Sequence, residues 1–413
     1  MFTGNDLQSF NMVTGIFMNE IVIETPKNEY ADSVKKHWDR IAKPLDGLGK
    51  FEYITARIGA IKGQKVFSLA KKTVLVFCSD NGIVEEGVSQ SPSDVTLRVM
   101  NNMLRGKSSM AVMAKGIGAK TYIVDIGVDC SLEDILPEKD RDDSAKFLDC
   151  KVRRGSRNFA KEPAMTEEET KKAIQIGIDL VGKLSEEGMD IIALGEMGIG
   201  NTTTSSAVSA AITGKPVELL VGRGAGLDDE GLKRKREIIS RALEKYNIFL
   251  NEADRIIDAG KKDVHTKSGT MTEKDLENAK SKALHVLQCM GGFDLAALTG
   301  AVIGGAVHHV PIVLDGVITM TAALVASKIA PGCLQYGILS HKGKEPAVEI
   351  LEEELIKAGA ICDSTIQASM ALGEGSGAVM MLSLLDLTME VYHNAAVFED
   401  LTMEQYTRFD SKK

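Results

Sequence analysis

The sequence predicts an α/β protein in which a parallel sheet is flanked by helices on both faces. Two observations support this prediction. Short runs rich in β-branched residues recur along the chain and end in small or acidic residues, and stretches with helical periodicity separate them. Both ends of the chain have helical patterns instead, which predicts a smaller helical unit built from the two termini.

The predicted strands and helices alternate, as in a Rossmann-like three-layer fold. We expect strands at residues 73–78, 120–125, 190–194 and 310–314. We expect helices at residues 94–105, 167–187, 229–250 and 274–289. Parallel sheets of this kind bind ligands beyond the carboxyl ends of their strands, so the functional residues are expected there.

The domain boundaries are placed where the pattern changes. Residues 28–61 and 384–399 are mainly helical, so residues 27–71 and 386–413 are expected to form a small helical domain. Residues 72–385 form the large α/β catalytic domain of this prediction, and residues 1–26 an N-terminal extension. The extension contains no Lys or Arg and so lacks the charged region of a signal peptide, which predicts a cytoplasmic protein. Met12 and Met18 offer alternative starts for the chain.

The composition excludes several classes of partner. A net charge of -9 disfavours nonspecific binding to nucleic acid or to an anionic membrane. The longest apolar stretch, residues 295–326, is interrupted by His308, Pro311 and Asp315, so it predicts a buried helix, a short strand and a second helix instead of a membrane span. The six cysteines are scattered without a CxxC pair, which favours reduced thiols over a disulfide framework or a metal site. A small-molecule partner is expected.

The first of three glycine-rich loops, residues 195–204, has the sequence GEMGIGNTTT and follows a predicted strand. Its glycines allow the backbone to approach an anion, and the following helix offers free N–H groups to a phosphate. An ordinary tight turn capped by Asn201 or Thr202 explains the same pattern. No GKS or GKT follows, so it is not a Walker loop.

The second loop, residues 222–231, has the sequence GRGAGLDDEG and is followed by Lys233, Arg234 and Lys235. Alternate glycines beside cations suit a phosphate or a carboxylate. Asp228 or Asp229 can cap the next helix, an interpretation that we favour over a metal site. The loop lacks the GxGxxG spacing of a dinucleotide fold.

The third loop, residues 372–378, places Glu374 between Gly373 and Gly375. A carboxylate flanked by glycines has little side-chain cover and can meet a substrate directly, which suits a general base. A turn with a glutamate that faces solvent is the alternative that the local pattern favours.

The ordered set of motifs resembles the nicotinate-nucleotide:dimethylbenzimidazole phosphoribosyltransferase family over nearly the whole chain. The motifs are KPLDGLG (43–49), SDNG (79–82), EGVS (86–89), GSRN (155–158), the two phosphate-type loops, GGFD (291–294), DG (315–316), SH (340–341), EP (345–346) and LGEG (372–375). The resemblance implies a homodimer that transfers the 5-phosphoribosyl group of nicotinate mononucleotide to a benzimidazole-like base, without a cofactor or metal. It also implies a parallel-sheet large domain and a small helical domain from both ends.

The resemblance also assigns roles to residues. It implies that Glu374 accepts the proton of the incoming base and that Glu196 is a second functional carboxylate. The residues that it assigns to the nucleotide and its phosphate are Gly198, Gly200, Asn201, Gly222, Gly224 and Lys235. Those that it assigns to the base pocket are Ser89, Ser91, Arg98, Met197 and Leu372.

The reaction chemistry is compatible with one base. The pyridine of nicotinate mononucleotide already bears positive charge at its glycosidic nitrogen and departs neutral, so it needs no general acid, unlike the leaving oxygen of a glycoside. A single displacement inverts the anomeric carbon. A second carboxylate near the oxocarbenium-like transition state is a role for Glu196.

Departures from the family pattern leave alternatives. Relatives often have Gln near Arg98, so a cation there could change the accepted base to a purine or a phenolic; the other possibility is that Arg98 turns outward and pairs with an acid. The chain could also be a noncatalytic or heteromeric paralogue that binds the nucleotide, although it retains Glu196 and Glu374. A nicotinamide-dependent dehydrogenase lacks support because the dinucleotide fingerprint is missing.

Overall fold

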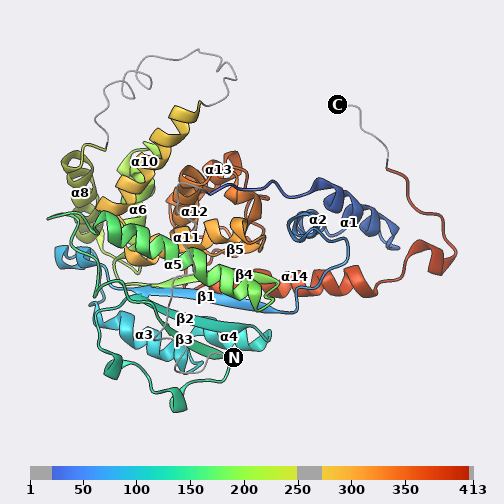
Figure 1. The fold of residues 1–413 in the computed structure, drawn as a ribbon, viewed down its shortest axis with the longest axis horizontal. Helices are drawn as coiled ribbons and strands as arrows, with labels where there is room; N and C mark the ends of the chain where they lie inside the picture. Colours follow the sequence, from blue (N-terminus) through green and yellow to red (C-terminus); the bar gives the residue numbers. More distant parts are fainter. Residues whose placement is uncertain (1–20, 249–271, 409–413) are drawn as a thin grey trace.

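A six-stranded sheet forms the centre of the computed structural model, which describes residues 21–248 and 272–408 (Figure 1). The strands are β1 Lys72–Ser79, β2 Lys120–Gly127, β3 Ala145–Asp149, β4 Ile191–Met197, β5 Ile312–Leu314 and β6 Gly337–Leu339. Their order is β3-β2-β1-β4-β5-β6, and each pair of neighbours is parallel. The predicted parallel sheet is confirmed. The winding reverses between β1 and β4, the switch point at which such sheets bind ligands.

The helices lie on both faces of the sheet, with α3 and α4 on one face and α5 on the other (Figure 1). The described α-helices are α1 Asn28–Arg40, α2 Lys50–Lys62, α3 Asp94–Leu104, α4 Ser109–Gly116, α5 Glu167–Glu186, α6 Asn201–Thr213, α7 Val217–Leu220, α8 Asp229–Lys245, α10 Glu273–Met290, α11 Phe293–Val307, α12 Val317–Ile329, α13 Ala347–Lys357 and α14 Ser376–Asn394. Glycines allow close packing of α11 on α5, since a Cβ on Gly300 would lie 1.9 Å from the carbonyl oxygen of Ile174. The predicted apolar stretch becomes α11, β5 and α12. None of the described helices is long and apolar enough to span a bilayer.

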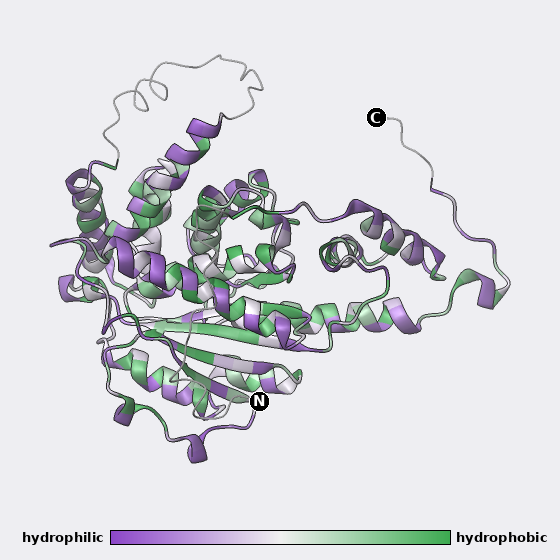
Figure 2. Cartoon of the chain, viewed as in Figure 1, coloured by the Kyte–Doolittle hydropathy of each residue, from purple (hydrophilic) through white to green (hydrophobic). Residues whose placement is uncertain are grey.

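The burial of the strands explains which of them the sequence reveals. All eight residues of β1 are buried. Helices cover both faces of a parallel sheet, and its central strands therefore have nearly continuous hydrophobic sequences. Figure 2 shows this hydrophobic centre, with hydrophilic residues on the outer surfaces of the helices. β3 (AKFLD) and β6 (GIL) lie at the two edges of the sheet and were not predicted, because they are short and carry little β-branched signal.

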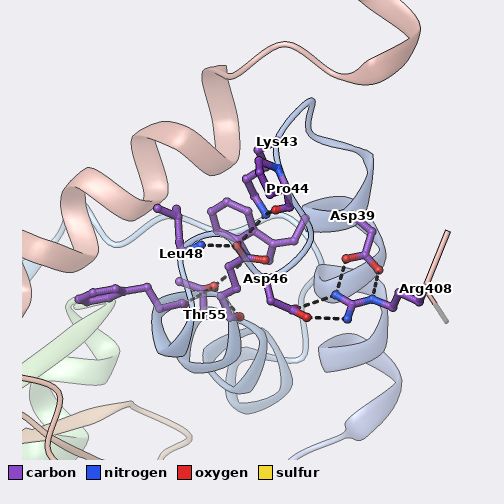
Figure 3. Close-up of polar contacts among 10 residues, drawn as sticks. Asp39, Lys43, Pro44, Asp46, Leu48, Thr55 and Arg408 are labelled. Atoms are coloured by element: carbon purple, nitrogen blue, oxygen red, sulfur yellow. Dashed lines mark hydrogen bonds and ion pairs between the residues drawn. The ribbon is translucent and has the colours of Figure 1, made fainter. Parts of the chain in front are cut away.

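The two ends of the chain pack together, as the helical pattern predicts. The ring of Trp38 in α1 lies 5.1 Å from that of Tyr392 in α14, and Ile41 pairs with Val397. Near the C-terminus, Arg408 donates to the carboxylates of Asp39 and Asp46 (Figure 3). The division into a small and a large domain stays a prediction, and the expected boundary at 385/386 falls inside the continuous helix α14.

Some element boundaries differ from those predicted. Residues 28–61, expected to be mainly helical, form the two helices α1 and α2, and the helical segment expected at 384–399 begins earlier, at Ser376. β4 continues to Met197, three residues beyond its expected end. Residues 249–250 of a predicted helix, the alternative starts Met12 and Met18, and most of the N-terminal extension lie outside the described residues.

Candidate active site

A pocket of about 370 Å³ lies at the carboxyl ends of β4, β5 and β6, beside the switch point of the sheet. Its wall includes the last residues of β4, the segments that follow β5 and β6, and parts of all three glycine-rich loops. The predicted site residues that line it are Ser89, Ser91, Glu196, Met197, Gly198, Gly200, Asn201, Gly224, Leu372 and Glu374. The fold thus gathers in one cavity residues that are far apart in the sequence, from Ser89 to Glu374.

Glu374 lies in a tight turn directly before α14, at the end of the segment that connects α13 to α14. Its φ is +63°, and its neighbours Gly373 and Gly375 have φ of +82° and +94°, so three consecutive residues adopt the left-handed region. Burial raises the pKa of Glu374, while hydrogen bonds from the Ser108 hydroxyl and the Met110 backbone lower it. Among the described residues, Oε2 has no hydrogen-bond partner. One oxygen of the carboxylate therefore has no competing donor, as a general base requires.

The sequence placed Glu196 in a loop after the strand. In the structure it is the penultimate residue of β4 itself. Its Oε2 accepts a hydrogen bond from Nδ2 of Asn201, at the start of α6. Its Oε1 lies beside the loop of Glu374, because a Cβ on Gly373 would be 3.1 Å away. Burial, with repulsion from Asp294, raises the pKa of Glu196 to about 8. Burial thus favours the neutral acid over the carboxylate in the free pocket.

The phosphate-type loops meet at the beginning of α6. Gly200 precedes the helix with a φ of +93°, and Gly224 lies so close to Thr202 that a Cβ on it would be 2.7 Å from the threonine hydroxyl. Lys235 of α8 joins the loops from behind: its ammonium donates to Thr202 Oγ1 at 3.0 Å and to the carbonyl of Gly222 at 3.3 Å. Burial lowers the pKa of Lys235 to about 8. Lys235 and Gly222 therefore support the pocket wall without being part of its lining.

The acids of the second loop have local roles. Asp228 caps α8 by accepting the N–H of Gly231 at 2.7 Å, which confirms the capping interpretation. Asp229 pairs with Arg223. Within residues 21–248 and 272–408, no group of three or more His, Cys, Asp or Glu side chains has the arrangement of a metal site.

Comparison with known proteins agrees with this arrangement. A family model described as phosphoribosyltransferase matches residues 23–273 and 259–402. A nicotinate-nucleotide–dimethylbenzimidazole phosphoribosyltransferase of Acetivibrio thermocellus is 38% identical over 378 residues, covering 92% of this chain and 95% of the relative. One from Ruminiclostridium cellulolyticum is 37% identical and covers 94% and 96% of the two chains. The crystal structure of CobT from Thermus thermophilus superposes with a TM-score of 0.75 at 32% identity, over 92% of this chain and all of that one.

The chain belongs to the nicotinate-nucleotide–dimethylbenzimidazole phosphoribosyltransferase family. The resemblance seen in its motifs is thereby confirmed, as is the α/β fold with a parallel sheet.

One residue assigned to the base pocket from the family pattern lies elsewhere in the structure. Arg98 pairs with Asp94 one turn earlier in α3, at 2.6 Å, and 76% of its side chain is exposed. Val95 and Val99 of the same helix line the pocket instead. Helical periodicity explains the difference, because positions 94 and 98 share one face of α3 and positions 95 and 99 another. The outward orientation that sequence analysis left as an alternative is the one observed.

Two further acids near the pocket were not assigned a role from the sequence. Asp294, in the first turn of α11, is fully buried and accepts from Asn201 Nδ2 at 3.2 Å, and burial raises its pKa to about 6. Asp315 directly follows β5 and lines the pocket together with His341, which follows β6 by two residues. The signal for both was present in the family motifs GGFD and DG, and Asp315 also stands at the carboxyl end of a predicted strand.

Proposed function

We propose that this protein transfers the 5-phosphoribosyl group of nicotinate mononucleotide to 5,6-dimethylbenzimidazole or a related base, giving α-ribazole 5′-phosphate and nicotinate. The proposal depends above all on the shared pocket, which Glu374 and Glu196 line together with two glycine-rich loops. The same activity is in the names of the relatives. It accounts for an anion site and a proton acceptor within one cavity.

Glu374 acts as the general base. A base nitrogen forms a bond to the anomeric carbon as the bond to the pyridine nitrogen breaks, and the pyridine leaves with the electron pair as neutral nicotinate nitrogen. The attacking imidazole becomes cationic and then loses its other N–H proton to the Glu374 carboxylate. Because attack and departure occur on opposite faces, the β-nucleotide gives an α-ribotide by inversion. Such proton transfer contributes roughly 10² to 10⁴ in rate.

Glu196 responds to the charge of the substrate. In the free pocket its pKa of about 8 keeps it protonated at neutral pH. A bound pyridinium or an oxocarbenium-like ribose brings positive charge, which favours the ionised carboxylate over the neutral acid. Substrate binding therefore promotes loss of the Glu196 proton, and the resulting carboxylate stabilises the developing cation.

The nucleotide phosphate binds at the start of α6. Gly198 and Gly200 allow the backbone to approach an anion closely, and Asn201 begins the helix, whose N-terminus favours negative charge. Gly222 and Gly224 form the opposite loop, and the Lys235 ammonium beneath both loops supplies positive charge.

The acceptor base occupies the part of the pocket lined by Ser89, Ser91, Met197 and Leu372, with Val95 and Val99 from α3. These side chains offer an apolar slot with hydroxyl groups, which suits a flat aromatic base. Arg98 lies outside this lining, so the hypothesis that a cation changes the acceptor has lost its structural basis. We expect dimethylbenzimidazole to be preferred over adenine and p-cresol.

The protein is expected to act as a homodimer in the cytoplasm. Apolar side chains exposed on α14, among them Met380 and Leu387, support a second copy as the partner. All six cysteines are free thiols, which is typical of a reducing compartment.

The decisive assay measures product formation from nicotinate mononucleotide with dimethylbenzimidazole, adenine and p-cresol in parallel. We expect an α-ribotide and free nicotinate from the wild type, and a fall of about 10² to 10⁴ in kcat for Glu374→Gln, because the amide cannot accept the proton. Glu353→Gln, an exposed change on α13, is the matched control and should leave kcat unchanged. Binding of the nucleotide without transfer to any acceptor would favour a noncatalytic or heteromeric paralogue.

A further inference from the structure

Three backbone N–H groups that follow Glu374 share one acceptor. The N–H of Gly375 donates to Oδ2 of Asp315 at 3.1 Å, and those of Gly377 and Ala378 donate to Oδ1 at 2.7 and 3.2 Å. These residues begin α14, and the first N–H groups of a helix have no acceptor within the helix. The Asp315 carboxylate therefore fixes the backbone on the C-terminal side of Glu374.

The loop of Glu374 depends on such external contacts. A non-glycine residue rarely adopts positive φ, and here Glu374 does so between two glycines that also have positive φ. A backbone of this kind persists only where its surroundings determine it. β4 also restricts the loop, because a Cβ on Gly195 would lie 2.4 Å from the carbonyl oxygen of Glu374.

Asp315 is itself well fixed. It directly follows β5 in the sheet and is 3% exposed. The Ser340 hydroxyl lies 3.3 Å from its carbonyl oxygen and 3.0 Å from Nδ1 of His341. That Nδ1 is 3.9 Å from Asp315 Oδ1, and it lies so close to Gly377 that a Cβ there would be only 1.9 Å away. The rigid ends of β5 and β6 thus determine the position of the carboxylate.

We propose that Asp315 is a positioning residue for Glu374, fixing the loop so that the Glu374 carboxylate meets the N–H of the acceptor base. The inference rests on the proposed function, in which Glu374 accepts a proton. Displacement of a catalytic group by about 1 Å can cost roughly 10²-fold in rate, so a contact made only to the backbone can matter as much as one made to substrate. Because Asp315 also lines the pocket, the test must separate this role from direct contact with the nucleotide.

A double-mutant cycle makes that separation. Asp315→Asn keeps the size of the side chain but replaces one acceptor oxygen by an N–H₂ group, which cannot accept from the backbone. We expect it to lower kcat by about 10- to 100-fold, with the KM for nicotinate mononucleotide changed less than about threefold. In the Glu374→Gln background the same substitution should change kcat less than about threefold, since residues that act through one another are not additive.

Asp125→Asn is the matched control. Asp125 is a fully buried acid near the carboxyl end of β2 that accepts the N–H of Val128 at 2.9 Å and pairs with Lys151 at 2.9 Å, and it does not line the pocket. Its replacement removes a comparable contact and should leave kcat unchanged. Thermal unfolding shows whether each variant folds. If Asp315→Asn does not fold, Asp315→Ser replaces it in the cycle, because serine is smaller and can accept one N–H.

An Asp315 effect as large in the Glu374→Gln background as in the wild type would overturn the proposal, as would a kcat no lower than that of the Asp125→Asn control. A change confined to the KM for the nucleotide would also overturn it, because direct binding would then explain the residue. Failure of the proposed function is distinct, since the wild type would then show no transfer before any variant was compared.

Discussion

At the scale of single residues, burial sets the protonation of the acids around the pocket. Burial raises the pKa values of Glu196, Asp294, Asp315 and Glu374, to about 8 for Glu196 and about 6 for Asp294. Each carboxylate in this cluster disfavours charge on the next, which favours the protonated form of Glu196 in the free pocket. A cationic substrate provides the charge that makes release of that proton favourable.

The raised pKa of Glu196 predicts a pH-dependent stability. The unfolded side chain loses its proton near pH 4.5 and the folded one near pH 8, so between these values the folded state binds more protons. The free energy of unfolding contributed by Glu196 is thus complete below pH 4.5 and is lost as the pH rises to 8. Glu196→Gln has no such titrating proton. The Tm of the variant minus that of the wild type should therefore increase as the pH rises from 5 to 8.

Tm measurements on both proteins across this range check the prediction. Glu353→Gln serves as the control, because an exposed glutamate should leave the difference from wild type constant with pH. A Tm difference between Glu196→Gln and wild type that is flat from pH 5 to 8 would show that Glu196 is ionised throughout, and the charge-responsive role proposed for it would fail.

At the scale of elements, Lys235 connects α8 to the start of α6. Its buried ammonium contacts Thr202 of α6 and the carbonyl of Gly222, so the two phosphate-type loops share one cation. Lys235 is one of three consecutive cations, with Lys233 and Arg234, and only the resemblance to the family singled it out in the sequence. The structure supplies the physical distinction, because Lys235 is fully buried whereas the Lys233 side chain is 78% exposed.

Lys235→Met should weaken binding of the nucleotide. A charge-assisted hydrogen bond is worth about 1.5 to 3 kcal/mol, so we expect the KM for nicotinate mononucleotide to rise by about 10- to 100-fold with a smaller change in kcat. The wild-type KM should also rise as the pH passes about 8 and Lys235 loses its proton, a dependence that the variant lacks. Steady-state kinetics from pH 7 to 9 test both points. Lys233→Met is the control, and a KM in Lys235→Met equal to that of this control would argue against the phosphate role.

The elements also show how much the sequence can reveal. The central strands were predicted because burial on both faces requires continuous hydrophobic runs. The glycine-rich loops were predicted because only glycine fits where the backbone comes so close to neighbouring atoms. β3 and β6 have no such signal, since three to five residues at a sheet edge need little β-branched character. The helical pattern at 94–105 was evident, but the family pattern assigned Arg98 to the base pocket, and only the structure decides for the outward orientation that was the alternative.

At the scale of the whole molecule, α14 links the candidate active site to the helices at the ends of the chain. It begins directly after Glu374, and its last turns contact α1 through the rings of Tyr392 and Trp38. The Tyr392 hydroxyl also donates to the carbonyl of Lys65 at 2.7 Å, in the segment that leads into β1. Packing of the terminal helices thus affects the same helix whose first residues position Glu374.

The outer surface of α14 predicts self-association. Met380, Leu384, Leu387 and Val391 recur at spacings of four, three and four, which places them on one face of the helix. Met380 is 41% exposed and Leu387 66%, and Val112 of the neighbouring α4 is 55% exposed. Exposed apolar side chains that gather on one face of a helix are typical of protein interaction surfaces. A second copy of the chain would cover this face and lie close to the Glu374 loop.

Leu387→Asp should therefore convert a dimer into a monomer. The leucine is exposed within one chain, so the charge should cost the isolated fold little, whereas at an interface it would be buried without a partner. Sedimentation velocity at micromolar concentration should give twice the chain mass for the wild type and for Leu219→Asp, a similarly exposed leucine on α7, but the single mass for Leu387→Asp. If all three sediment as monomers, the homodimer is wrong. If Leu387→Asp remains a dimer, the interface lies elsewhere, and α14 would then transmit the packing of the chain ends to Glu374 without a partner subunit.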